Sequence, residues 1–284
     1  MNTAAPENAP LARPVLSRAG LIGAAVLLAA LVSLFAGARF GLMLLLGLGF
    51  GVALEGLRFG FAGPWRAMIL RREPAGILAQ LLAIGIVACV AIPMLAAFPT
   101  ELSGAQAPIG WAMIGGAFVF GAAMQVVLGC GSGTLVNAGS GNPISLVALP
   151  FFAIGSFAGA YHLFWWTELG SLPILTLSGT YGLAVTLIGL VLAAAVLIAL
   201  GKKGSRALPR RYVFAAIAVA VLAIGNLLVA GQPWGVVYGL GLWVAKVAVV
   251  FGADLSGSAF WAASASVDRI NSSVLTDYTS LTNF

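Results

Sequence analysis

The feature that most constrains the fold of this chain is a series of apolar stretches, separated by short segments that carry most of its charges. A helix that crosses a membrane needs about 20 predominantly apolar residues. A helix also satisfies its own backbone hydrogen bonds, which lipid cannot do. The pattern therefore predicts an all-α polytopic membrane protein. Clear candidates for the helices are Leu21–Ala36, Ala75–Phe98, Ile109–Leu128, Ile144–Trp166, Tyr181–Leu200, Tyr212–Ala230 and Trp234–Phe251.

One further stretch, Phe40–Leu54, is apolar but short. It fits either a tilted crossing or a half-helix that enters the membrane and returns, and both interpretations stay open. The composition excludes a large soluble domain, because 61% of the residues are hydrophobic and only 8% are charged, against about 25% charged in soluble domains.

The distribution of Lys and Arg predicts the orientation. The segments Pro99–Pro108 and Thr167–Thr180 contain neither residue type. If Phe40–Leu54 crosses, the basic clusters all fall on one side, which the positive-inside rule makes cytoplasmic. The net charge of +6 thus reports topology, and we expect no nucleic-acid partner. The clusters are Arg13 and Arg18; Arg58, Arg66, Arg71 and Arg72; and Lys202, Lys203, Arg206, Arg210 and Arg211.

An internal repeat is indicated when the chain is shifted by 70 residues, so that FGVALEGLRFGFAG falls on FGAAMQVVLGCGSG. Phe50 then meets Phe120, Gly60 meets Cys130, and Glu55 meets Gln125. Both windows share an apolar helix, a break of small residues and a polar turn. Transporters often contain such repeats, with broken helices that meet near the middle of the membrane.

The most unusual segment is LGCGSGTLVNAGSGNP, Leu128–Pro143, which has five glycines and no charge. We expect a break at Gly129–Gly141 and a new helix that starts at Pro143 after an Asn142 cap. Such a break frees backbone N–H groups, and helix N-termini attract anions. Hydroxyl and amide side chains add further polar groups. The alternative, a polar loop at the membrane surface, remains open because loops are rich in the same residues.

Single polar residues in this chain allow two interpretations each. Cys130 is either a small buried hydrophobe or an accessible thiol between two glycines, suited as a weak donor to a soft acceptor such as sulfur. Packing is favoured for Cys89, and an interfacial position for Glu55. One histidine and scattered carboxylates give no metal site, and no nucleotide or nucleophile motif occurs. We therefore expect no metal, no cofactor and no enzyme activity.

Three segments of the chain carry a family resemblance: FGAAMQVVLGCGSGTLVNAGSGN, RFGFAGPWRAMILRR and the later QPWGVVYGLGLWVAKV with SSVLTDYTSLTNF. From about Phe40 onward the chain resembles the YeeE/YedE family of sulphur-compound transporters. The resemblance implies a pseudo-symmetric helical bundle with re-entrant half-helices, and import of thiosulfate. It also implies that cysteines in the pathway pass the ion along by S–H···S hydrogen bonds, with Cys130 as one relay thiol.

The chain departs from the family pattern in two ways. Many relatives have RFC in the first motif, where this chain has Arg58, Phe59 and Gly60, so the thiol at that position is absent. Relatives also continue with further helices beyond the position of Phe284. We therefore expect either a fragment or a pathway that another chain completes.

The sequence thus predicts a cytoplasmic tail over residues 1–18 and a membrane transport domain over 19–284, incomplete at its C-terminal part, with repeat-like units near 40–74 and 110–143. The expected function is uptake of thiosulfate or a related sulfur-containing anion across a bacterial inner membrane. Alternatives are a selenium or other sulfur cargo, or a non-transporting scaffold for a sulfur-carrier enzyme. Expected partners are the anion, lipid and a cytoplasmic sulfurtransferase or sulfur-carrier protein. The expected pathway residues are Cys130, Gly129, Gly131, Ser132, Gly133, Thr134, Asn137, Gly60 and Arg58.

Overall fold

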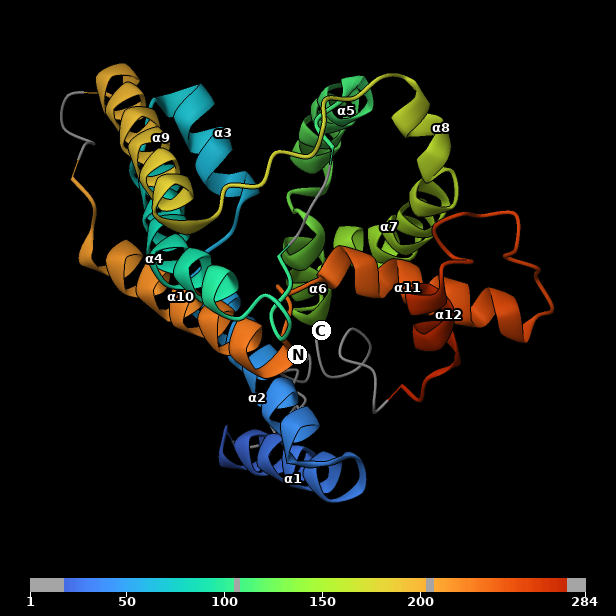
Figure 1. Ribbon diagram of the computed structural model, residues 1–284. Helices are drawn as coiled ribbons and strands as arrows, with labels where there is room; N and C mark the ends of the chain where they lie inside the picture. Colours follow the sequence, from blue (N-terminus) through green and yellow to red (C-terminus); the bar gives the residue numbers. More distant parts are fainter. Residues whose placement is uncertain (1–17, 105–107, 203–206, 275–284) are drawn as a thin grey trace, which may run out of the picture.

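The computed structural model describes residues 18–104, 108–202 and 207–274, with side chains from Gly20 onward. Arg13, Lys203, Arg206 and most of the predicted tail lie outside the described residues. Apart from an isolated bridge between Gly110 and Ser171, the described secondary structure is helical. The helices are α1 (Arg18–Ala36), α2 (Ala38–Gly56), α3 (Ala62–Arg71), α4 (Ala75–Ala97), α5 (Trp111–Val127), α6 (Gly131–Gly139), α7 (Pro143–Tyr161), α8 (Leu163–Glu168), α9 (Gly179–Leu200), α10 (Arg210–Ala230), α11 (Val236–Val250) and α12 (Ser264–Asn271) (Figure 1).

Among the described residues, six stretches are long and apolar enough to cross a membrane. They are α2, α4, α7, α9, α10 and a stretch that runs through α5 and α6. The predicted all-α polytopic membrane protein is therefore confirmed. The 19 residues of α2 span about 28 Å at 1.5 Å per residue, so the stretch around Phe40–Leu54 has the length of a full crossing.

Two predicted helices are shorter than expected. Ile144–Trp166 is interrupted at His162, which ends α7 and precedes the six-residue α8. Trp234–Phe251 contains only α11, because Gly235 is the residue before the first helical turn. At 15 residues α11 is about 22 Å long, which is less than the roughly 30 Å of the hydrocarbon layer.

One group of helices is built around α2, α4 and α10 (Figure 1). Helix α1 packs on α2, and α3 and α9 pack on α4. Small residues let the backbones approach, as is common between membrane helices. Ala79, Ala83 and Ala216 form the buried contact between α4 and α10. Between α2 and α10, a Cβ added at Gly49 would come within 2.8 Å of Leu222 Cδ2.

The antiparallel helices α2 and α10 are joined at both ends by arginines. Arg39, near the start of α2, donates to the carbonyl oxygen of Val229 in the last turn of α10. Arg211, near the start of α10, donates from Nη2 to the carbonyl oxygen of Leu57, 2.8 Å away. Cations at helix C-termini satisfy carbonyl groups that have no intrahelical donor. At the second of these ends, Lys202 N also donates to Arg72 O, so two of the predicted basic clusters meet there.

A second group contains α6, α7, α11 and α12. Its core is the cluster of Leu242, Ala245 and Trp261. Trp261 Nε1 donates to the Phe157 carbonyl oxygen at 3.2 Å, which ties the segment after α11 to α7. Lys246 on α11 donates to the carbonyl oxygens of Arg269, Ile270 and Ser272 at the end of α12. Its charge therefore has a structural partner at a helix C-terminus.

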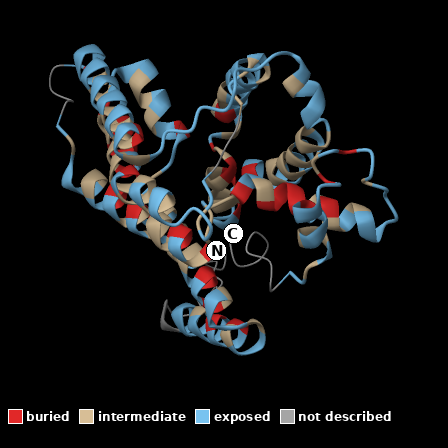
Figure 2. Cartoon of the chain, in the orientation of Figure 1, coloured by how far each residue is buried: buried red, intermediate tan, exposed pale blue. Residues whose placement is uncertain are grey.

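The outer helices expose apolar side chains. Figure 2 shows exposed residues along most of α5 and α9, whereas buried residues gather on α2, α4, α10, α6 and α11. Phe118 on α5 is 80% exposed and Val191 on α9 is 67% exposed. In a membrane protein such surfaces face lipid, which is as apolar as these side chains.

Candidate functional site around the break between α5 and α6

The chain between α5 and α6 makes a short, sharp break. Leu128 ends α5 with φ 59°, in the left-handed region, and Cys130 is the residue before the first turn of α6, with an extended backbone. Thr134 N donates to the Cys130 carbonyl oxygen at 2.7 Å, which starts the helical ladder. The predicted break at Gly129–Gly141 is therefore wrong in extent, because a helix occupies Gly131–Gly139.

Two glycines at the break, Gly129 and Gly131, make close contacts that leave little room for a side chain. A Cβ added at Gly129 would lie 2.8 Å from Thr134 N and 2.9 Å from Thr134 Oγ1. A Cβ added at Gly131 would lie 2.9 Å from Val237 Cγ2 and 3.1 Å from Phe152 Cζ. Real Cβ atoms do not approach backbone nitrogen so closely, so a larger residue at Gly129 would displace the first turn of α6.

Polar groups gather at the N-terminus of α6. Cys130 Sγ lies 3.4 Å from Ser132 Oγ, within reach of a sulfur hydrogen bond. The first amide groups of a helix have no intrahelical acceptor, so those of Gly131, Ser132 and Gly133 lie beside the thiol. Thr134 is 1% exposed, and its Oγ1 has no hydrogen-bond partner among the described residues. An unpaired buried hydroxyl is costly, so a polar partner for Thr134 Oγ1 would stabilise this end of α6.

The other end of α6 turns sharply into α7. Gly141 has φ 84°, and Asn142 Oδ1 accepts from Ile144 N at 3.0 Å and Ser145 N at 3.1 Å. Asn142 is thus the cap of α7, with Pro143 at the first helical position, as the sequence predicts. Asn137 Nδ2 lies 3.5 Å from the Leu128 carbonyl oxygen, which makes at most a weak bond across the α5–α6 break.

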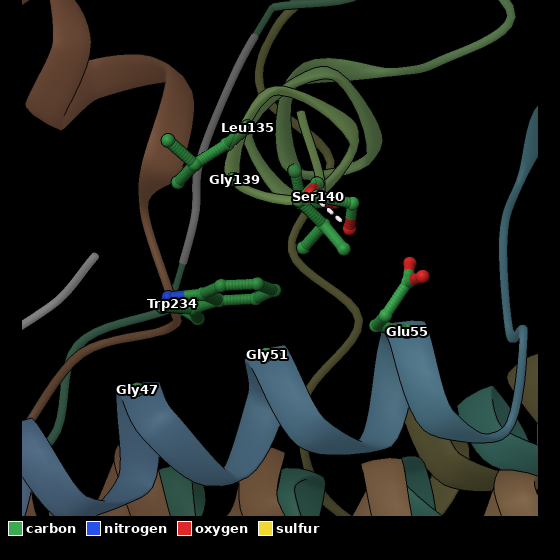
Figure 3. A pocket seen from close by; sticks show the side chains of 9 residues that line it. Gly47, Gly51, Glu55, Leu135, Gly139, Ser140 and Trp234 are labelled. Atoms are coloured by element: carbon green, nitrogen blue, oxygen red, sulfur yellow. Dashed lines mark hydrogen bonds between the residues drawn. The ribbon is translucent and has the colours of Figure 1, made fainter. Parts of the chain in front are cut away.

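A cavity of about 420 Å³ lies between α2 and α6, beside Trp234. Helix α2 contributes Gly47, Gly51 and Glu55, which recur every four residues and therefore share one helix face. Trp234 closes one side and stacks on Phe50, with ring centroids 4.0 Å apart. In Figure 3 the Glu55 carboxylate points from α2 into the space beneath Ser140. The lining from α6 consists of Ser132, Leu135, Val136, Gly139 and Ser140.

Ser132 connects the thiol to this cavity. Its hydroxyl lies beside Cys130 Sγ, and the same residue lines the cavity wall. Cys130 itself is half-buried behind Ser132. The expected residues Gly129, Cys130, Gly131, Ser132, Gly133, Thr134 and Asn137 therefore all belong to one continuous segment, the break and α6.

Arg58 and Gly60 lie in a different break, between α2 and α3. Arg58 is exposed and has φ 51°, and the Gly60 carbonyl oxygen accepts from Gln80 Nε2 at 3.0 Å. Neither residue lines the α2–α6 cavity. A Cβ added at Gly60 would meet no atom within 4 Å, so the missing thiol of the first motif leaves open space.

Sequence reasoning missed two residues of this site. Trp234 precedes α11 and Glu55 is an exposed residue in the last turn of α2; both line the cavity. The interfacial position favoured for Glu55 stays a prediction. The spacing of Gly47, Gly51 and Glu55 was a usable signal, because it marks one face of α2 that small residues keep open. No group of three or more His, Cys, Asp or Glu side chains that could hold a metal ion occurs in the described part of the chain.

Comparison with known families identifies the family of this chain. Residues 57–276 match the family described as sulphur transport. The matched range includes the break between α2 and α3, the break between α5 and α6, helix α6 and Trp234. A comparison with curated proteins gave no match.

Proposed function

Because the chain belongs to the sulphur transport family, we propose that it carries thiosulfate or a related sulfur-containing anion into the cytoplasm across a bacterial inner membrane. The family and the apolar helices make it a multi-pass membrane protein of sulfur-compound transport. The observation that carries the finer proposal is the N-terminus of α6, where a thiol, two hydroxyls and helical amides converge.

The chemistry of this site matches the two ends of thiosulfate. The Cys130 S–H is a weak donor and would donate to the soft terminal sulfur of the anion. The amides of Gly131 and Gly133 and the hydroxyls of Ser132 and Thr134 would donate to its oxygen atoms, as helix N-termini do for other oxyanions. The unpaired Thr134 hydroxyl supports this assignment, because a bound oxygen atom would satisfy it.

In this mechanism α6 forms the narrow part of the pathway. The anion moves along the α6 N-terminus by exchanging hydrogen bonds, and no covalent bond is made or broken. Import against a potential of 100 mV, negative inside, costs about 2.3 kcal/mol per charge, or about 4.6 kcal/mol for a divalent anion. A source of free energy is therefore required.

The proposal is tested by uptake of radiolabelled thiosulfate into bacterial cells that lack other importers. The cells express the wild-type gene, Cys130→Ala or the control Cys89→Ala, which removes the other thiol. We expect uptake by wild type and Cys89→Ala and a loss of at least about tenfold in Cys130→Ala at equal membrane abundance, the factor that corresponds to about 1.4 kcal/mol.

Equal uptake by Cys130→Ala and wild type would remove the thiol from the mechanism. Uptake that unlabelled selenium or other sulfur anions suppress more strongly than unlabelled thiosulfate does would reassign the cargo. If the protein is instead a scaffold, charge reversal at Lys202 and Arg210 would abolish its function. Both residues are exposed. Arg211 is unsuitable for that test because it holds the Leu57 carbonyl oxygen.

A further inference from the structure

The segment between α10 and α11, residues 231–235, carries Trp234 into the α2–α6 cavity. We call this segment the α10–α11 linker. The Trp234 ring lies parallel to the ring of Phe50 on α2, with the centroids 4.0 Å apart, and Figure 3 shows it between α2 and Leu135 of α6. The position of the linker therefore sets one wall of the cavity that Ser132 also lines.

Three elements hold the linker by hydrogen bonds. The Gly231 carbonyl oxygen accepts from Ser103 N at 2.8 Å, in the segment after α4. The Gln232 carbonyl oxygen accepts from Nδ2 of Asn226, a residue of α10 that is 1% exposed, at 3.1 Å. The Gln232 side chain accepts at Oε1 from Arg269 Nη2 of α12, 2.9 Å away. The bond from Arg269 therefore ties the linker to the second group of helices.

Arg269 is itself fixed in place. Its guanidinium group lies over the Tyr238 ring, 5.3 Å from the centroid. Its carbonyl oxygen accepts from Lys246 Nζ and, at 2.8 Å, from Ser272 Oγ. A planar guanidinium that is already oriented loses little freedom when it donates a hydrogen bond, and a charged donor makes a stronger bond than a neutral one. The bond to Gln232 is therefore a firm support for the linker.

We propose that Arg269 is a positioning residue for transport, which fixes the linker through Gln232 and thereby holds Trp234 in the cavity wall. Arg269 does not line the cavity, so its effect on the anion passes through the linker. The inference rests on the proposed function, in which the anion reaches the N-terminus of α6 beside this wall. Binding groups have to be held to within about 0.5 Å of their productive positions, so a released linker weakens binding of the anion.

The first test measures the position of Trp234 without transport, by fluorine NMR of the purified full chain labelled with fluorotryptophan. The Trp234 signal is assigned by its loss in Trp234→Phe. We expect Arg269→Met to shift or broaden this signal, because the linker loses one support. Arg269→Lys, whose ammonium group also donates, should keep the signal close to that of wild type.

A second variant and a control accompany this measurement. Gln232→Leu removes the acceptor and leaves Arg269 on the Tyr238 ring, which covers the case in which Arg269→Met does not fold. We expect it to change the Trp234 signal as Arg269→Met does. The matched control is Arg66→Met, because Arg66 is an exposed residue of α3, and its spectrum should equal that of wild type. An unchanged Trp234 signal in both Arg269→Met and Gln232→Leu overturns the inference.

The second test measures initial rates of labelled thiosulfate uptake into lipid vesicles that contain the purified full chain. We expect KM to rise about tenfold in Arg269→Met and in Gln232→Leu, the scale of one hydrogen bond from a charged group. The maximal rate should stay close to that of wild type. The double variant should be no worse than either single variant, because both changes remove the same bond.

The outcomes separate the inference from the proposed function. Effects on KM that add in the double variant, or a lower maximal rate with an unchanged KM, overturn the inference alone. A KM for Arg269→Lys close to that of wild type supports it. A wild type that transports no thiosulfate overturns the proposed function and the role of Arg269 in transport, and the fluorine spectra then still decide whether Arg269 positions Trp234.

Discussion

Arg58 and Leu128 lie 70 residues apart and both adopt the left-handed backbone conformation close to the end of a long helix, with φ 51° and 59°. Leu128 follows α5 directly, whereas Leu57 lies between α2 and Arg58. Each residue is followed by a short helix, α3 or α6, and then by a helix long enough to cross the membrane. The order long helix, left-handed residue, short helix, long helix thus occurs twice at the spacing that the sequence shift predicts. The two segments therefore share one order of elements, and of the two positions that the shift aligns, Gly60 and Cys130, only the second carries a thiol.

Replacement of Leu128 by glycine should be tolerated by the fold. A non-glycine residue in the left-handed region costs about 1 kcal/mol or more, and glycine removes that cost. Leu128 is 50% exposed, so few packing contacts are lost. We expect Leu128→Gly to leave the melting temperature in detergent unchanged or raise it. The control Val126→Gly, inside α5, should lower stability by about 1 kcal/mol; a Leu128→Gly protein that melts as early as the control would contradict this account.

Replacement of Gly129 by alanine should disrupt the break between α5 and α6. The added methyl group would collide with the amide nitrogen of Thr134, and overpacking against backbone costs about 1–3 kcal/mol. The matched control is Gly133→Ala, whose Cβ would lie 3.6 Å from Cys130 Sγ, an ordinary contact. We expect a lower melting temperature and loss of thiosulfate uptake for Gly129→Ala, with Gly133→Ala at least as stable as wild type. Equal behaviour of the two variants would show that the close contact is not limiting.

The two thiols should differ in their reaction with charged reagents. Cys130 is half-buried and adjoins Ser132, which lines the cavity. Cys89 lies in an apolar groove between α4 and α9, with Leu78 and Leu190 among its neighbours. In a membrane we expect a charged methanethiosulfonate reagent to label the Cys89→Ala protein, and thiosulfate to slow that labelling.

The complementary variant Cys130→Ala, in which Cys89 is the remaining thiol, should react with a lipid-soluble maleimide and not with the charged reagent. Labelling rates are followed by mass spectrometry of the intact protein. Rapid labelling of Cys89 by the charged reagent would show that the α4–α9 groove is open to water, contrary to this account.

The long helices could be predicted from the sequence because each is a nearly uninterrupted apolar run. Helix α6 could not, because its glycines each cost about 1 kcal/mol in a helix and the local pattern favours a loop. Packing decides its structure: Gly131 lies against Val237 and Phe152, and α6 packs on both α7 and α11. Local preference is routinely overridden by such contacts.

The composition of the site could be predicted only in part. Cys130, Ser132 and Thr134 fall within five consecutive residues, so a single motif contains them. Glu55 and Trp234 enter the site from α2 and from the residues before α11. Their contribution depends on how helices far apart in sequence are placed side by side, which hydropathy does not encode.

The two arginine contacts between α2 and α10 have a mechanical consequence. A slide of one helix along the other by one turn, about 5.4 Å, would break the Arg39–Val229 and Arg211–Leu57 bonds together. The two contacts therefore hold α2 and α10 in a fixed register relative to each other. A change in the width of the cavity therefore leaves the α2–α10 contact unchanged and alters the contact between α2 and α6.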